Sequence, residues 1–246
     1  MSRNFELLQQ IEKEHEVFSA PIPPAVSGNG HRPRFNHDAF GQEERMKLVQ
    51  RLFILPGLEA PRVVMFCGVE SGDGSSWVCA RASETLASQV KASVCVVDAN
   101  FRTPSLHEHF RTDNLLGLAD AVRQSGPARD FAHQLNGGNL WLITCGSKTP
   151  DPHALLTSDL LHSRITELRA EFDYILVDGP PVNLYADATL LGRLADGVVL
   201  VLQANFTRRE AAIKAKESLQ AAKVRVCGAV LNKRTFPVPD FLYRKI

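Results

Sequence analysis

Residues 63–81 read Val63-Val-Met-Phe-Cys-Gly-Val-Glu-Ser-Gly-Asp-Gly-Ser-Ser-Trp-Val-Cys-Ala-Arg81. An apolar run of strand length comes first, a glycine-rich turn follows, and a helical pattern begins near Ser75. In this order the turn arranges backbone N–H groups around a concavity, and the N-terminus of the helix adds a partial positive charge. The stretch therefore predicts a phosphate-binding loop between a buried strand and a helix.

The predicted loop has no lysine. Loops of this class usually end in Gly-Lys followed by Ser or Thr, where the lysine reaches the β- and γ-phosphates and the hydroxyl binds Mg²⁺. Here Gly74 is followed by Ser75 in the lysine position and by Ser76 in the hydroxyl position. Asp73 adds a negative charge that we expect to repel a triphosphate, and Trp77 adds a large ring that packs beside the loop or obstructs it. The chain thus has the scaffold of a nucleotide-binding enzyme without its main phosphate cation.

Apolar runs of strand length alternate with helical patterns along the rest of the chain. The expected strands are Val63–Cys67, Val94–Val97, Leu140–Thr144, Tyr174–Val177, Val198–Leu202 and Val226–Leu231. The expected helices are Glu43–Leu55, Ser76–Lys91, Leu116–Val122, Ala154–Phe172, Ala186–Leu194 and Arg208–Ala222. Continuous apolar strands separated by helices predict an α/β fold with a doubly wound, mostly parallel sheet. Ligands of such sheets bind at the carboxyl ends of the strands.

Two further strand ends carry acids. Asp98 follows one expected strand and begins the segment Asp98–Arg102, and Asp178 follows another and begins the segment Asp178–Pro181. Acids in these positions hold Mg²⁺, directly or through water. A strand-terminal aspartate also commonly caps the following turn, so each motif alone supports either interpretation. The three strand ends together favour descent from a P-loop nucleotide-binding protein, with Ser76, Asp98 and Asp178 as the metal ligands.

These motifs give the chain a family resemblance. It resembles the cytoplasmic domain of the bacterial tyrosine autokinases of capsule and exopolysaccharide biosynthesis, which are relatives of the MinD and ParA ATPases. The resemblance runs from about Glu43 to Asn232. Its segments are Gly72–Ser76, Asp98–Arg102, Gly146, Asp151-Pro152-His153, Leu155-Leu156-Thr157-Ser158 and Asp178–Pro181.

The resemblance implies a P-loop NTPase fold and, if binding is retained, ATP and Mg²⁺ as cofactors. The cofactor-binding residues that it implies are Gly72, Asp73, Gly74, Ser75, Ser76, Trp77, Arg102 and Asn232. It makes Asp98 and Asp178 the catalytic residues or their vestiges, and Asn232 a base-contacting residue. It also implies a membrane-embedded polysaccharide chain-length regulator or co-polymerase as partner, and a homo-oligomer as a further possibility.

Departures from the family pattern concern both the catalyst and its substrate. Ser75 removes a cation, and Asn100 stands where the family has a second acid, although an amide cannot act as a carboxylate base. Losing one preorganised stabiliser of the transition state typically costs roughly 10²–10³ in rate. The family carries a C-terminal tyrosine cluster, whereas this tail holds only Tyr243. These departures favour a weakly active or inactive member that regulates exopolysaccharide or capsule assembly by binding partners.

Three alternatives remain open on the sequence alone. The first is an active ATP-dependent protein-tyrosine autokinase that uses another cation, such as Arg102. The second is a positioning ATPase like MinD or ParA, although Pro237 and Pro239 break any helical membrane tail. The third is a structural module that no longer binds nucleotide.

Composition limits where the chain works. Its 246 residues carry a net charge of +1, which gives no case for nucleic-acid binding. Scattered cysteines favour a cytoplasmic protein, and the lack of a long apolar run favours membrane recruitment only through a partner. Because Ser19 to Arg34 is rich in proline and glycine, we expect residues 1–40 to form a flexible arm and linker and residues 41–246 to form one domain.

Overall fold

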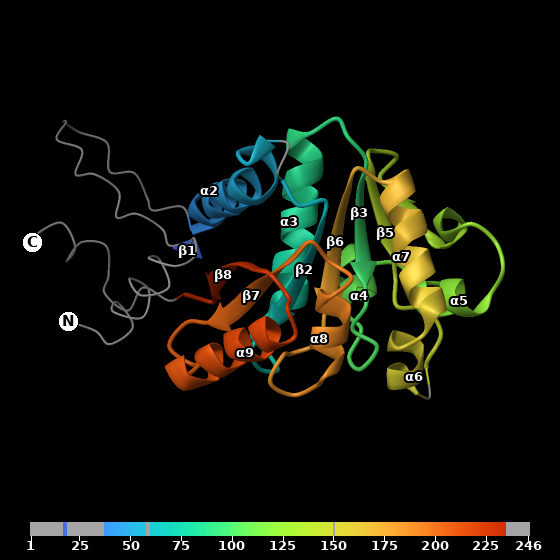
Figure 1. Cartoon of the computed structure of the whole chain (residues 1–246). Helices are drawn as coiled ribbons and strands as arrows, with labels where there is room; N and C mark the ends of the chain where they lie inside the picture. Colours follow the sequence, from blue (N-terminus) through green and yellow to red (C-terminus); the bar gives the residue numbers. More distant parts are fainter. Residues whose placement is uncertain (1–16, 19–36, 58–59, 150, 235–246) are drawn as a thin grey trace, which may run out of the picture.

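The computed structural model describes residues 17–18, 37–57, 60–149 and 151–234. An eight-stranded sheet with the order β1-β8-β7-β2-β6-β3-β5-β4 forms its centre (Figure 1). The strands are β1 Val17–Phe18, β2 Val63–Gly68, β3 Val94–Asp98, β4 His133–Leu135, β5 Leu140–Ile143, β6 Tyr174–Gly179, β7 Gly197–Gln203 and β8 Val226–Asn232. Every neighbouring pair is parallel except β4–β5. The predicted mostly parallel sheet is confirmed.

Helices cover both faces of this sheet (Figure 1). On one face lie α2 His37–Val49, the π-helical turn η1 Gln50–Ile54, α3 Ser75–Gln89 and α4 Leu106–Phe110. On the other lie α5 Leu118–Arg123, the 3-10 turn η3 Ala128–Phe131, α6 Pro152–Leu156, α7 Asp159–Glu171, α8 Asp187–Gly192 and α9 Arg209–Ala221. This arrangement is the doubly wound α/β fold that the alternating pattern predicts.

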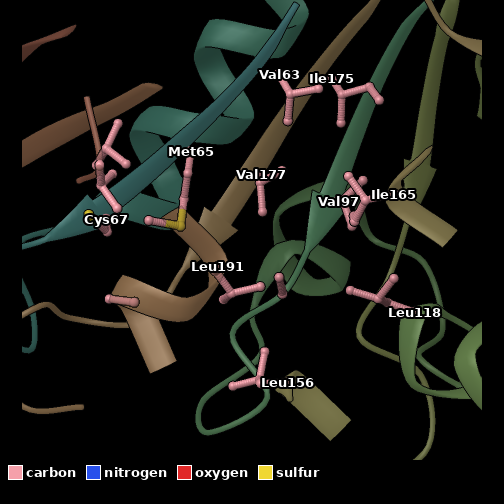
Figure 2. Close-up of a cluster of buried hydrophobic side chains, with 14 of the residues drawn as sticks. Val63, Met65, Cys67, Val97, Leu118, Leu156, Ile165, Ile175, Val177 and Leu191 are labelled. Carbon is pink, nitrogen blue, oxygen red and sulfur yellow. The ribbon is translucent and has the colours of Figure 1, made fainter. Parts of the chain in front are cut away.

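Strand β2 shows why the apolar runs are continuous. Val63, Met65 and Cys67 belong to the core under α5–α9, whereas Val64 and Phe66 belong to the core under α2–α4. Figure 2 shows the first of these clusters, with side chains from β2, β3, β6 and the helices that pack on this face. A strand buried on both faces needs apolar side chains at every position, so it shows no polar alternation.

The expected helix Ala154–Phe172 is wrong as one element, because it forms two helices. α6 ends at Leu156, and α7 begins at Asp159. Ser158 separates them as an N-cap, since its hydroxyl accepts a hydrogen bond from the Leu160 N–H at 3.1 Å. The short elements α4, η3 and β4 were not expected from the sequence.

The N-terminal segment meets the domain at two places that the structure describes. β1 pairs in parallel with β8, with Val17 opposite Ala229, and α2 begins at His37, before the proposed domain boundary at residue 41. The rest of the proposed arm, and Tyr243, lie outside the described residues. None of the described helices is long and apolar enough to cross a membrane.

Candidate functional site

The three predicted strand ends lie together at one edge of the sheet. β2, β6 and β3 are adjacent, with Cys67 opposite Gly179 and Asp98 opposite Asp178. Because these strands are parallel, the loop after β2 and the two acids share the carboxyl edge. This edge is where doubly wound sheets bind ligands.

The loop after β2 has the backbone of a phosphate-binding turn. Gly72 and Gly74 both have a φ of +86°, in the left-handed region that favours glycine. Helix α3 begins directly after Gly74, and no side chain caps its N-terminus at that residue. The first N–H groups of α3 are therefore available to an anion, as the sequence predicts.

The carboxylate of Asp73 is buried and holds the loop in place. Oδ2 accepts a hydrogen bond from the Glu70 N–H at 2.8 Å, and Oδ1 accepts one from the Thr207 hydroxyl at 3.0 Å. The side chain is 1% exposed. Asp73 thus connects the loop to the turn between β7 and α9, a role that its sequence position does not reveal.

The end of β8 packs directly on the loop. Nδ2 of Asn232 donates to the carbonyl oxygen of Asp73 at 2.9 Å, and Nζ of Lys233 donates to the carbonyl oxygen of Gly72 at 2.6 Å. The family resemblance implies a base-contacting role for Asn232 and no role for Lys233. The only signal for Lys233 in the sequence is that it follows Asn232.

Two glycine substitutions should separate backbone strain from this packing. A Cβ on Gly74 would lie 2.4 Å from Nδ2 of Asn232, whereas a Cβ on Gly72 would have no neighbour within 4 Å. Both have the same φ, so Gly72→Ala should cost about 1–2 kcal/mol of stability and Gly74→Ala at least about 1 kcal/mol more. Urea unfolding of both variants measures the difference. Equal losses of stability would show that the Asn232 side chain moves away from the added Cβ at no cost.

Asp178 is a buried carboxylate without a hydrogen-bond donor. It is 0% exposed, and neither of its oxygens has a hydrogen-bond partner among the residues that the structure describes. Burial raises the pKa of Asp178 well above its usual range, and the charge of Asp98 raises it further. The hydroxyl of Ser76 lies near enough to lower this pKa, but it is outside hydrogen-bonding geometry. Such a group requires a proton or a cation.

Asp98 has a different environment, although it lies opposite Asp178. Its carboxylate accepts hydrogen bonds from the backbone N–H groups of Asn100 at 3.1 Å and of Ser105 and Leu106 at 3.0 Å. Burial raises its pKa to about 6, and the three backbone donors oppose that rise. Asp98 therefore caps the start of α4, in agreement with the alternative interpretation of strand-end acids.

Two other predicted residues have protein partners. Nε of Arg102 lies 2.9 Å from Oδ2 of Asp187, and its guanidinium stacks 4.8 Å from the ring centroid of Tyr185. The ring of Trp77 is 41% exposed and lies under the guanidinium of Arg45 on α2. Trp77 thus packs toward α2, and Arg102 is engaged on α8.

The residues present fit Mg²⁺ and a nucleotide. Mg²⁺ is usually bound through one or two carboxylates, with several waters retained. Asp178 supplies such a carboxylate, and Ser76 lies near it. Among the described residues no three His, Cys, Asp or Glu side chains form a metal cluster. A Mg²⁺ ion held by these two residues would have coordination positions left for phosphate and water.

Comparisons with known proteins agree with this geometry. No protein-family model matches the chain. Its fold matches the kinase domain of Escherichia coli tyrosine kinase ETK with a TM-score of 0.80 at 22% identity, over 98% of this chain and 99% of that one. It also matches MinD complexed with Mg-ADP from Pyrococcus horikoshii, with a TM-score of 0.60 at 18% identity, over 75% and 76%. The chain thus has the P-loop NTPase fold, which it shares with MinD and with a tyrosine-kinase domain.

Sequence relatives give the family. The chain is 34% identical over 169 residues to tyrosine-protein kinase YwqD of Bacillus subtilis. The aligned residues make up 71% of YwqD and 69% of this chain. It is 29% identical over 173 residues to tyrosine-protein kinase CpsD of Streptococcus agalactiae, over 70% and 75%. The chain belongs to the bacterial tyrosine-protein kinase family.

Proposed function

We propose that this chain is a nucleotide-binding member of the tyrosine-protein kinase family that transfers phosphate weakly or not at all. In this role it regulates exopolysaccharide or capsule assembly by binding a partner. One observation carries the proposal: Ser75 occupies the lysine position at the first residue of α3. The serine hydroxyl carries no charge, and its side chain is too short to reach the γ-phosphate as a lysine does.

The surroundings of the loop support weak transfer. The side chain of Asn100 exchanges hydrogen bonds with Thr103, through Nδ2 to the Thr103 hydroxyl at 3.1 Å and through Oδ1 from its N–H at 3.2 Å. It therefore holds a turn and offers no carboxylate base. Arg102, the replacement cation suggested by the sequence, is paired with Asp187.

Binding and transfer make different demands on these residues. A bound Mg²⁺ supplies charge neutralisation across the phosphate oxygens. Ser76 and Asp178 are the residues that would hold it, and the backbone of Gly72–Ser76 would bind the phosphates. These groups orient a nucleotide, whereas transfer also needs a cation that stabilises the charge developing in the transition state.

An active kinase is the second candidate, favoured by the position of Lys233. Its ammonium lies on the loop, so the site has a cation although the loop sequence has none. A positioning ATPase has less support, because its relationship to the chain is one of fold alone.

The proposed partner is a membrane-embedded chain-length regulator or co-polymerase, with the chain in the cytoplasm and recruited to the inner face of the membrane. Kinship with tyrosine-protein kinase wzc of Salmonella typhi supports this, at 28% identity over 170 residues. The chain covers 24% of wzc, so the matched region is one part of a longer protein. We assign docking to residues 1–40 and leave self-association as a further proposal.

Turnover of purified protein tests the proposal. With Mg²⁺ and γ-labelled ATP, we expect hydrolysis and autophosphorylation at least about 100-fold below the roughly 1–100 s⁻¹ of protein kinases. The double variant Ser76→Ala, Asp178→Ala sets the background for contaminating activity. A rate within the kinase range that this variant abolishes would contradict the proposal and favour the active kinase.

A further inference from the structure

Lys233 lies on the phosphate-binding loop that has no lysine of its own. Its Nζ donates a hydrogen bond to the carbonyl oxygen of Gly72 at 2.6 Å and lies 3.4 Å from Oε1 of Gln203. A Cβ on Gly74 would lie 3.6 Å from Cε of Lys233, so the end of this side chain follows the loop. A cation from the end of β8 thus lies beside the helix start where Ser75 replaces the usual lysine.

The backbone holds Lys233 in this position. β8 ends at Asn232, whose amide donates to the Asp73 carbonyl oxygen at 2.9 Å. Lys233 follows with a φ of +54°, a conformation that residues with a Cβ rarely adopt. The fold therefore maintains an unfavourable backbone geometry at the residue that carries the ammonium group.

Folding alone gives little reason for this placement. Both contacts of Lys233 are with neutral oxygens, and its side chain is exposed. Within residues 17–18, 37–57, 60–149 and 151–234, it forms no ion pair. An exposed ammonium on a carbonyl oxygen stabilises a protein little, because water offers it equivalent partners. Its charge remains available to an anion at the loop.

We propose that Lys233 is the phosphate-binding cation of this site and that its ligand is the polyphosphate of a nucleoside di- or triphosphate. The inference rests on the nucleotide site of the proposed function. The flexible stem of a lysine lets its ammonium move from the Gly72 carbonyl oxygen to a phosphate oxygen without a change in the backbone.

A second feature of the same edge points to a polyphosphate with a bound cation. Asp178 is fully buried, and in the described part of the chain no donor forms a hydrogen bond with its oxygens. An uncapped helix N-terminus, an ammonium bound only to neutral oxygens and a buried carboxylate around one loop fit a metal-bound polyphosphate. A simple anion would leave Asp178 without its cation.

Calorimetric titration with ADP in the absence of Mg²⁺ tests Lys233 separately from phosphoryl transfer. Replacing Lys233 by Met removes a charge-assisted contact, so we expect ADP affinity to fall roughly 10–100-fold. Lys233→Arg keeps the charge and should retain most of the affinity. The matched control is Lys91→Met, which removes the same charge just beyond the far end of the 15-residue helix α3, roughly 20 Å away. Adenosine, which has no phosphate, should bind the wild-type chain and Lys233→Met equally.

The melting temperature of each variant shows whether a loss of affinity comes from a loss of folding. Lys233→Gln provides a second uncharged side chain, one that keeps an N–H donor. Equal ADP affinity of wild type, Lys233→Met and Lys233→Gln would overturn the inference, as would the absence of ADP binding to the wild-type chain. Equal losses in Lys91→Met and Lys233→Met would also overturn it, because they would indicate a long-range charge effect. Fast phosphoryl transfer would contradict the proposed function but leave the role of Lys233 intact.

Discussion

At pH 4, where both carboxyl groups are protonated in the folded state, Asp98→Asn is expected to lower the free energy of unfolding by about 2–3 kcal/mol, whereas Asp178→Asn is expected to change it by less than about 1 kcal/mol. The substitution is chemically the same at two residues that lie opposite each other on β3 and β6. Both side chains are 0% exposed. Their hydrogen-bond partners differ.

The expected loss at Asp98 follows from its three backbone donors. Its oxygens accept from the N–H groups of Asn100, Ser105 and Leu106. An asparagine has one acceptor oxygen, and its NH₂ group would face an N–H group in place of the other. Each buried donor left without an acceptor costs about 1–3 kcal/mol. The start of α4 should therefore loosen in Asp98→Asn.

Asp178 has no donor to lose, so its substitution acts mainly through pH. The pKa of Asp178 is raised in the folded state, which therefore binds its proton more tightly than the unfolded state does. Such a group favours folding at low pH, and this contribution is lost as the pH rises from the ordinary aspartate pKa of about 3.9 through the folded value. Asp98, with its pKa of about 6, contributes in the same direction over the lower part of that range.

Urea unfolding between pH 4 and pH 8 measures both effects. In Asp178→Asn, stability should decline less with rising pH than in the wild-type chain, and the two curves should diverge toward high pH. Added Mg²⁺ should stabilise the wild-type chain more than Asp178→Asn. Parallel pH curves would show that Asp178 is ionised throughout and has a partner. A larger loss in Asp178→Asn than in Asp98→Asn would reverse the assignment of the two acids.

The pair also shows what the sequence can predict about this site. Both aspartates follow apolar runs, so the pattern predicts that each lies at the carboxyl edge of the sheet, and the structure has them there. The pattern cannot tell which acid caps a helix, because that depends on whether the backbone N–H groups of the following residues donate hydrogen bonds to its carboxylate. α4 does so for Asp98 and is too short to give a helical period of its own.

Local periodicity also limits what could be predicted of the fold. The strands were predictable because burial on both faces requires apolar residues at every position, as in Val63–Gly68. The break between α6 and α7 was not, since Ser158 is polar in a region where a helix surface would also be polar. Lys233 was missed for a related reason. Its contact with Gly72 joins residues far apart in the sequence, and no short-range pattern records such a contact.

Ser75→Lys is expected to strengthen ADP binding roughly 10–100-fold when Lys233 is replaced by Met, and clearly less in the wild-type chain. The reason is that a cation at the start of α3 and the ammonium of Lys233 would bind the same phosphates. Two groups that share one ligand are not additive. Adding Asn100→Asp should increase Mg²⁺-dependent binding further only if the new carboxylate faces the metal rather than Thr103.

A double-mutant cycle with Ser75→Lys and Lys233→Met, measured by ADP calorimetry, gives the coupling directly. Ser75→Gln is the control, because it adds length at the same helix start without charge, and it should leave affinity within about 2-fold of wild type. A Ser75→Lys gain of the same size in both backgrounds would mean that Lys233 does not contact the phosphates. No gain in either background would mean that the loop is closed to phosphate. The other features that phosphate binding needs are already present at the loop: a left-handed Gly74, an uncapped first turn of α3 and the neighbouring carboxylate of Asp178.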